Sequence, residues 1–188
     1  TAALVISFIA LGASWHQPKL ASLTKGRPSK ALSLVTKLFE PIIRLLSTGL
    51  FFLVLATGFF GTNASDQNLN PVTLYVIFWV VLQILVCLLG DIWKVLSPFD
   101  TIAILLERLG LTKSHQIPDW SHWFAPIGAF AFLFFELIHP NGDSPFLLST
   151  GILVYSSCLI IGVFVWGRDW LKVGDAFAVH FRLLAQMA

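Results

Sequence analysis

The sequence predicts an all-α bundle of five transmembrane helices, the first truncated, with amphipathic surface helices on the cytoplasmic side. Three observations predict this class. The 188 residues are 56% hydrophobic and only 12% charged, whereas a soluble domain carries about 25% charged residues. The stretches that lack charge are continuous rather than periodic, which is typical of lipid-facing helices. All 12 Lys and Arg residues fall in alternate connections between these stretches, as membrane topology requires.

Five apolar stretches are expected to cross the membrane. The first covers residues 2–14 and spans only ~20 Å, less than the ~30 Å of hydrocarbon. It therefore indicates the end of a helix whose start lies upstream, so residues 1–188 are expected to form a single transmembrane domain of a longer native chain. The other four predicted spans are 42–60, 72–89, 123–139 and 146–166.

Three amphipathic helices are expected on the membrane surface. The first is capped by Ser29 and carries an apolar side made by Leu32, Val35, Leu38 and Phe39. The second starts at Ser97 and Pro98, since proline is favoured at the first helical position. Its apolar side is Phe99, Ile102, Leu106 and Leu109, and Gly110 ends it. The third starts at Asp175, with Phe177, Phe181 and Leu184 inward.

The distribution of basic residues predicts the orientation. Six Lys and Arg lie in 16–44, three in 91–120 and three in 168–182, while the turns 61–70 and 140–145 have none. Because positive loops stay in the cytoplasm, the three basic segments are predicted to be cytoplasmic and the two short turns outside. Arg44, in the first turn of its span, is expected to extend towards the headgroups.

Each helix that enters the cytoplasm ends in Gly-x-x-Trp. The tryptophans are Trp15, Trp93 and Trp170, and we expect them to anchor the chain at the membrane interface. The spacing indicates either a parallel duplication or only the general enrichment of Trp at interfaces.

Glu136 is the only acidic residue inside a predicted span, and His139 follows it by one helical turn. The pair has three interpretations. Glu136 is a packing residue hydrogen-bonded to Ser or Tyr of a neighbouring helix, or it handles protons or substrate as a catalytic residue with His139. Alternatively, Glu-x-x-His supplies two metal ligands, with Asp66 or Asp143 as further candidates. Tyr155 or Ser149 of the fifth span is the hydroxyl expected to reach Glu136.

Several other chemistries lack sequence support. Cys87 and Cys158 lie in apolar stretches and are expected to pack rather than to form a disulfide or bind metal. His16, His115, His122 and His180 show no zinc-binding spacing, and no histidine lies in mid-span, so no haem or chlorophyll ligand is expected within the spans. There is no phosphate-binding loop and no nucleic-acid signature. Cofactors are therefore unknown apart from expected lipid contacts.

Four strings carry a resemblance: VISFIALGASWHQPKLA, GDIWKVLSPFDTIAILLERL, FFELIHPNGDSP and GRDWLKVGDAFAVHFRLLA. Together they resemble a family of bacterial, actinobacterial-type multi-pass membrane proteins often labelled fenitrothion hydrolase. The matching motifs are Trp93, Leu96 and Pro98; Glu136 and Pro140; and Gly174, Asp175 and Phe177. The resemblance implies the bacterial cytoplasmic membrane, and its label implies hydrolysis of organophosphate esters.

Three functions follow as hypotheses. The first is an accessory or scaffold subunit of a larger membrane complex, with other membrane subunits and the lipid bilayer as partners and no nucleic acid. The second is a membrane-bound ester hydrolase whose site lies near the outer face at Glu136 and His139. The third is a carrier for a small apolar or weakly acidic solute.

Overall fold

The computed structural model describes residues 30–113 and 115–187, and every regular element in these ranges is helical. The long elements are α2 (Lys30–Phe60), the π-helix η3 (Val72–Val81), α4 (Leu82–Leu89), α7 (Phe124–Leu137) and α8 (Pro145–Trp166). The shorter elements are η2 (Ser65–Gln67), α3 (Leu69–Pro71), α5 (Trp93–Leu96), α6 (Pro98–Arg108), η4 (Asp119–Trp123), η5 (Arg168–Trp170), α9 (Leu171–Gly174), α10 (Ala176–Leu184) and η6 (Ala185–Met187). The predicted span 2–14, Trp15, His16 and the cap Ser29 lie outside the described residues.

Three helices in the described ranges are long and apolar enough to cross a membrane: Phe39–Phe60, Leu69–Leu89 and Pro145–Trp166. They include the predicted spans 42–60 and 72–89 entirely, and they match 146–166 to within one residue. The all-helical, membrane-compatible class is therefore confirmed.

Only part of the predicted span 123–139 is α-helical. Its α-helical part, α7, has 14 residues and covers about 21 Å, short of the hydrocarbon thickness. The 3-10 helix η4 precedes it, and the chain leaves the helix at Ile138, close to Pro140. A fourth span is therefore not confirmed at full length.

The predicted surface helix before the span 42–60 does not exist as a separate element. α2 runs without a break from Lys30 to Phe60, with Pro41 inside it. Glu40 accepts a hydrogen bond from Arg44 Nε at 2.9 Å, four residues on and across the proline. Arg44 also does not extend freely to the headgroups, because its Nη1 donates to Asp100 at 2.7 Å.

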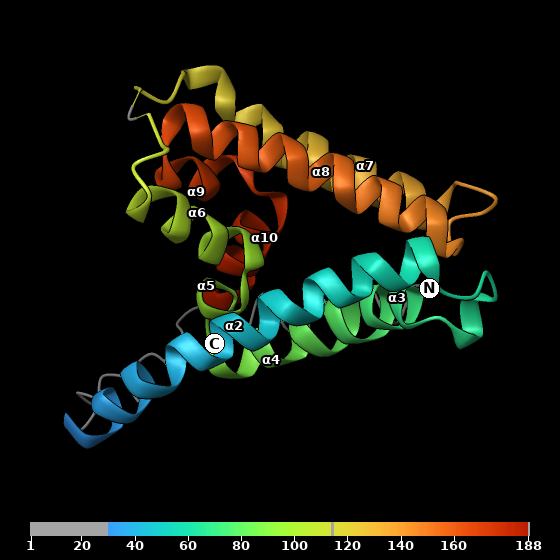
Figure 1. Cartoon of the computed structure of the whole chain (residues 1–188), viewed down its shortest axis with the longest axis horizontal. Coiled ribbons are helices and arrows are strands. Elements are labelled where there is room, and N and C mark those ends of the chain that lie inside the picture. The colour runs from blue at the N-terminus through green and yellow to red at the C-terminus, as the bar shows by residue number, and fades with distance from the viewer. Residues whose placement is uncertain (1–29, 114, 188) are drawn as a thin grey trace, which may run out of the picture.

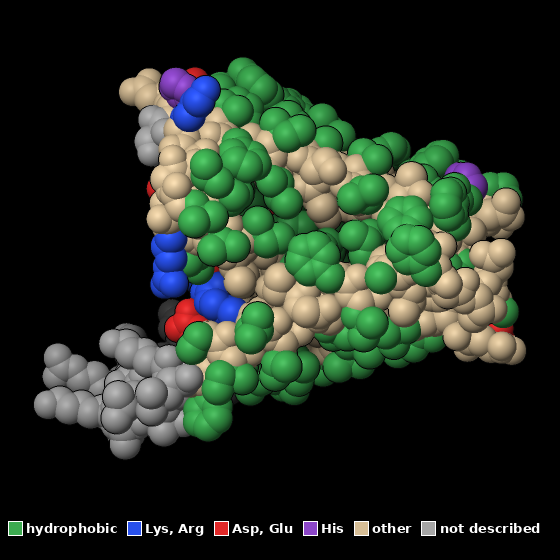
Figure 2. Space-filling view, viewed as in Figure 1, with side chains coloured by type: hydrophobic (Ala, Val, Ile, Leu, Met, Phe, Trp, Pro, Cys, Tyr) green, Lys and Arg blue, Asp and Glu red, His purple; other side chains and the backbone are tan. Residues whose placement is uncertain are grey.

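The short helices α5, α6, α9 and α10 gather at one end of the long helices (Figure 1). α2 packs along α8, and α10 contacts both α7 and α4. On the face shown in Figure 2, Lys and Arg side chains gather at the end where α6 lies, and apolar side chains cover most of the remaining length. We call this end the basic end, and the end with turns 61–68 and 138–144 the turn end.

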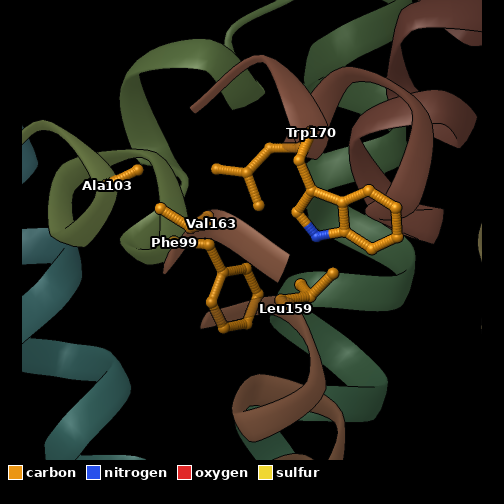
Figure 3. Packing of buried hydrophobic residues seen from close by; sticks show 6 residues of the cluster. Phe99, Ala103, Leu159, Val163 and Trp170 are labelled. Atoms are coloured by element: carbon orange, nitrogen blue, oxygen red, sulfur yellow. The ribbon is translucent and has the colours of Figure 1, made fainter. Parts of the chain in front are cut away.

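The short helices pack crosswise against the long ones. Phe99 and Ala103 of α6 lie in one buried cluster with Leu159 and Val163 of α8 and with Trp170 (Figure 3). A second cluster joins Phe181 of α10 to Leu82, Val86 and Trp93 of α4 and α5. α6, which lies between α4 and α7 in the chain, thus packs against α8, and α10, which lies after α8, packs against α4. These contacts bury Pro98, Phe99 and Ala103 of α6 and Ala176 and Phe181 of α10, whereas Leu109 of the predicted apolar side is exposed.

The two described Gly-x-x-Trp motifs have the same backbone geometry. Gly90 ends α4 with φ 83° and ψ −162°, and Gly167 ends α8 with φ 80° and ψ −176°. This positive φ favours glycine because it has no Cβ. In both cases one or two short helical turns follow, and a longer helix, α6 or α10, then starts at a capping side chain, Ser97 or Asp175. A glycine with positive φ is a common helix end, and Gly110 has one as well, so the parallel duplication stays a prediction.

Candidate functional site

At the turn end, a polar pocket of about 330 Å³ is lined by Tyr75, Glu136, His139, Pro140, Gly142 and Asp143. We call it the turn-end pocket. The structure thus brings the predicted pair Glu136 and His139 together with Asp143, one of the two extra ligands considered. It adds Tyr75, which the sequence did not place there.

Among the described residues, Glu136 forms no hydrogen bond with the other side chains that line this pocket. Tyr75 donates its hydroxyl hydrogen to the carbonyl of Gly142 at 2.6 Å. His139 Nδ1 accepts from the amide of Asn141 at 3.2 Å, and its ring stacks on Phe135 with centroids 5.2 Å apart. Glu136 Oε2 is buried without a hydrogen-bond partner. The pocket therefore holds one carboxylate oxygen free to take a proton or a donor.

The hydroxyls expected to reach Glu136 are engaged elsewhere. Ser149 lies in a buried polar contact with Asn70, whose Nδ2 donates to its hydroxyl at 2.7 Å. Tyr155 donates to Asp175 at 2.6 Å, near the start of α10. That prediction is wrong because α8 turns these residues towards α2, α3 and α10 rather than towards Glu136. Asp66 does not line the pocket, and residues 30–113 and 115–187 contain no group of three His, Cys, Asp or Glu placed to hold a metal ion.

A second cavity, of about 310 Å³, lies among α2, η3, α4, α8 and the short helices of the basic end. We call it the apolar cavity. Its wall is drawn from seven elements and carries no charged residue: Ser47, Leu50, Phe51 and Val54 of α2; Thr73, Leu74, Ile77, Phe78 and Val81 of η3; Leu82 and Leu85 of α4; Trp93 and Leu96 of α5; Pro98 and Phe99 of α6; Ile152 and Tyr155 of α8; and Phe177 of α10.

The apolar cavity reaches the outer surface of the described bundle between α2 and η3–α4. Four residues of its wall are more than a third exposed: Leu50, Ile77, Val81 and Leu85. They lie on helices that are long and apolar enough to cross a membrane. A cavity open on that side would connect with the hydrocarbon of a bilayer rather than with water.

Most polar groups on the wall of the apolar cavity already have partners. Ser47 donates to the carbonyl of Arg44 at 3.0 Å, and Trp93 Nε1 donates to Asp175 at 3.4 Å. Thr73 differs, because its side chain is only 9% exposed and its hydroxyl has no partner. A buried hydroxyl without a partner is costly, and such groups require an explanation.

The wall containing Thr73 is a π-helix of ten residues, Val72–Val81. The π-helix is rare, usually a single turn, and frequent at functional sites. Five of its residues line the apolar cavity. The unusual backbone is therefore concentrated on the part of the bundle that shapes this cavity.

Asp175 supports the opposite wall. It is fully buried and caps α10 by accepting from the amide of Phe177 at 3.0 Å. It also accepts from Tyr155 and Trp93, two residues that line the cavity. Burial raises the pKa of the Asp175 carboxyl, whereas the hydrogen bond from Tyr155 acts in the opposite direction. Asp175 thus fixes the orientation of two aromatic side chains on the cavity wall.

Asp100 joins three elements at the basic end. Its carboxylate accepts from Arg44 of α2 at 2.7 Å and from Arg168 of η5 at 2.6 and 2.9 Å. A hydrogen bond to Asp100 raises the pKa of the Arg168 guanidinium. Because the two arginines come from segments 124 residues apart, this cluster holds α6 between α2 and the end of α8.

The two described members of the predicted interface anchors are inside the protein. Trp93 is 7% exposed and Trp170 only 1% exposed. Trp170 packs between Phe124 and Trp166, with ring centroids 5.0 and 4.8 Å away. Rings buried to this extent contact protein and have little surface left for headgroups. Trp15 lies outside the described residues.

Sequence reasoning missed Thr73, Tyr155 and Asp175 as parts of one site. The signal for Asp175 was present, since an acidic residue before an apolar helix is a capping pattern, but capping alone does not reveal its long-range partners.

No family model, no curated protein and no solved structure matches the chain.

Proposed function

We propose that this protein is an integral membrane protein that binds a lipid-class molecule in the apolar cavity. The main support for this proposal is the cavity itself. Its wall contains no charged residue, and it opens between two helices that are long and apolar enough to cross a membrane. Its volume of about 310 Å³ is at the lower end of the ~300–1,000 Å³ of ligand sites. It is about twice the ~150 Å³ of an apolar cavity that binds benzene.

The proposed topology places the basic end in the cytoplasm and the turn end outside. The gathering of Lys and Arg at one end supports it (Figure 2), because positive segments are retained in the cytoplasm. α7 together with η4 then forms a shorter fourth crossing, and the bacterial cytoplasmic membrane is the membrane that the family resemblance implies. A cysteine at the exposed position 66 should react with an impermeant thiol reagent added outside intact cells.

Lipid binding suits two of the functions expected from the sequence. A carrier for a small apolar solute would load through the opening between α2 and η3–α4. An accessory subunit of a larger membrane complex would hold the molecule for a partner subunit. Purification from native membrane with identification of associated proteins separates them, because only the subunit keeps stoichiometric partners.

A photo-crosslinking experiment tests whether the apolar cavity binds such a molecule. The full chain in liposomes is labelled with an alkyl chain that carries a diazirine, and the labelled residues are identified by mass spectrometry. We expect saturable labelling of the cavity wall that excess unlabelled chain removes. Labelling of lipid-facing residues is expected to rise without saturation.

A matched pair of variants gives the control. Val54→Trp fills the cavity from a position that is 6% exposed, whereas Val154→Trp adds the same side chain at a position that is 59% exposed and outside the cavity wall. Val54→Trp should abolish the saturable labelling, and Val154→Trp should retain it. Equal labelling in both variants would overturn the proposal.

The turn-end pocket favours a second candidate, the membrane-bound ester hydrolase. Its support is that Glu136, His139 and Asp143 line one open polar pocket, in which Glu136 Oε2 is unpartnered and available as a general base. Purified protein is assayed with a phosphotriester, with and without divalent metal. Loss of turnover in Glu136→Gln, but not in Glu107→Gln at the opposite end, is the expected result. A lack of phosphotriester turnover both with and without divalent metal would refute the hydrolase proposal.

A further inference from the structure

We infer that the molecule bound in the apolar cavity is neutral and carries one hydroxyl or carbonyl oxygen, which hydrogen-bonds to Thr73. This inference rests on the proposed function and narrows it to a chemical class. The class comprises long-chain alcohols, esters and ketones, and it leaves out fatty-acid anions and phospholipids.

The absence of charge on the described cavity wall excludes an ionised headgroup inside it. A charge moved into such surroundings without a partner is strongly disfavoured. The charged side chains nearest in sequence to the wall are already paired. Asp100, next to Phe99, accepts from Arg44 and Arg168, and Lys94, next to Trp93, pairs with Asp91. Asp175, two residues before Phe177, accepts hydrogen bonds from Tyr155 and Trp93. None of them is left to receive an ionic headgroup.

Thr73 requires a partner that the described protein does not supply. Its hydroxyl can donate one hydrogen bond and accept others, and it is buried on the cavity wall without a partner. A threonine in a helix commonly bonds a carbonyl one turn earlier, as Thr101 does with Ser97 at 3.2 Å. Thr73 does not, so its hydroxyl is available to a ligand.

A trapped water does not fit this position as well as a ligand oxygen does. A buried water normally makes about three hydrogen bonds, whereas Thr73 is the one polar side chain of the described wall that has no partner. Tyr155, for example, donates to Asp175 and accepts from the amide of Ala176 at 2.9 Å. A ligand oxygen needs only the one bond from Thr73, because its apolar remainder is stabilised by burial.

The position of Thr73 also orients the molecule. Thr73 lies in the first turn of η3, close to the turn end, while Trp93, Leu96 and Pro98 line the cavity towards the basic end. The oxygen is therefore directed to the turn end, and the hydrocarbon part extends towards α5 and α6.

The test compares two photo-probes on the full chain in liposomes, a dodecyl diazirine and the same chain with a terminal hydroxyl. We expect the hydroxylated probe to half-saturate the cavity wall at about five-fold lower concentration, which corresponds to ~1 kcal/mol. Thr73→Val should remove this advantage, and Thr73→Ser should keep it. Thr150→Val is the matched control, because Thr150 lies outside the cavity wall and donates to the carbonyl of Phe146.

Competition with 1-dodecanol and with dodecanoate at alkaline pH completes the test. We expect 1-dodecanol to displace the hydroxylated probe at lower concentration than dodecanoate does. If both probes saturate equally, or Thr73→Val leaves the advantage intact, or dodecanoate competes as well as the alcohol, the inference is overturned while the proposed function stands. If neither probe labels the wall saturably, the proposed function itself is overturned.

Discussion

The contact between Gly162 and Trp170 allows a quantitative test of the packing. A Cβ at Gly162 of α8 would overlap the indole Nε1 of Trp170. The ring cannot move aside easily, because it is 1% exposed and packs against Phe124 and Trp166. Overpacking of this kind costs ~1–3 kcal/mol. The rigid surroundings place Gly162→Ala near the upper value.

Gly151 on the same helix is the matched control, because a Cβ there meets nothing within 4 Å. Replacing glycine by alanine inside a helix gains up to ~1 kcal/mol from helix propensity, and both variants share this gain. We therefore expect Gly162→Ala to lower the free energy of unfolding by ~2 kcal/mol and Gly151→Ala to raise it by up to ~1 kcal/mol. The difference of ~3 kcal/mol corresponds to roughly 6–12 °C in Tm for a chain of this size.

Thermal unfolding in detergent micelles, followed by circular dichroism, measures both variants. Combining Gly162→Ala with Trp170→Leu removes the overlapping atoms, so the cost of the alanine should largely disappear in that background. Equal Tm values for Gly162→Ala and Gly151→Ala would refute the reasoning, as would an undiminished cost of the alanine in the Trp170→Leu background.

Three further predictions concern polar groups. Asp100→Asn should reduce the free energy of unfolding by ~2 kcal/mol, a value discounted because one of its arginines is 40% exposed. Asp169→Asn, at a position 72% exposed, should change it by less than ~0.5 kcal/mol. Tyr155→Phe removes a hydrogen bond to the fully buried Asp175 and should cost ~2 kcal/mol in a urea titration. Burial lowers the pKa of His180, so stability should be complete above about pH 6.5 and fall below it. His180→Gln should reduce this loss of stability at low pH. An unchanged dependence of stability on pH in that variant would contradict the role given to His180.

The spans could be predicted from the sequence because a continuous apolar stretch has few alternatives in water or lipid. The segments 72–89 and 146–166 needed only composition and length. The helix ends at Gly90 and Gly167 also followed from local sequence, since each glycine ends an apolar stretch and starts a Gly-x-x-Trp motif followed by polar residues. The turn-end pocket was partly predictable, because Glu136 and His139 lie one turn apart on one helix.

The apolar cavity could not be predicted, because its wall combines residues from seven elements that are distant in the sequence. Hydropathy does not distinguish Leu50, which lines this cavity, from Leu53, which lies outside its wall. Arg44 was expected to extend to headgroups because its partner Asp100 lies 56 residues further on. The π-helical backbone of 72–81 likewise has no pattern in the sequence that separates it from an ordinary α-helix.

The crosswise packing of α6 and α10 has a consequence for biogenesis. As the chain leaves the ribosome, α6 is complete long before α8, yet Phe99 and Ala103 need α8 to be covered. In the proposed membrane topology, the side of α6 that contacts α8 would therefore stay uncovered until the second half is made, although Phe99 already contacts Phe51 of α2. Truncation after residue 113 should then leave a product that membrane quality-control proteases degrade.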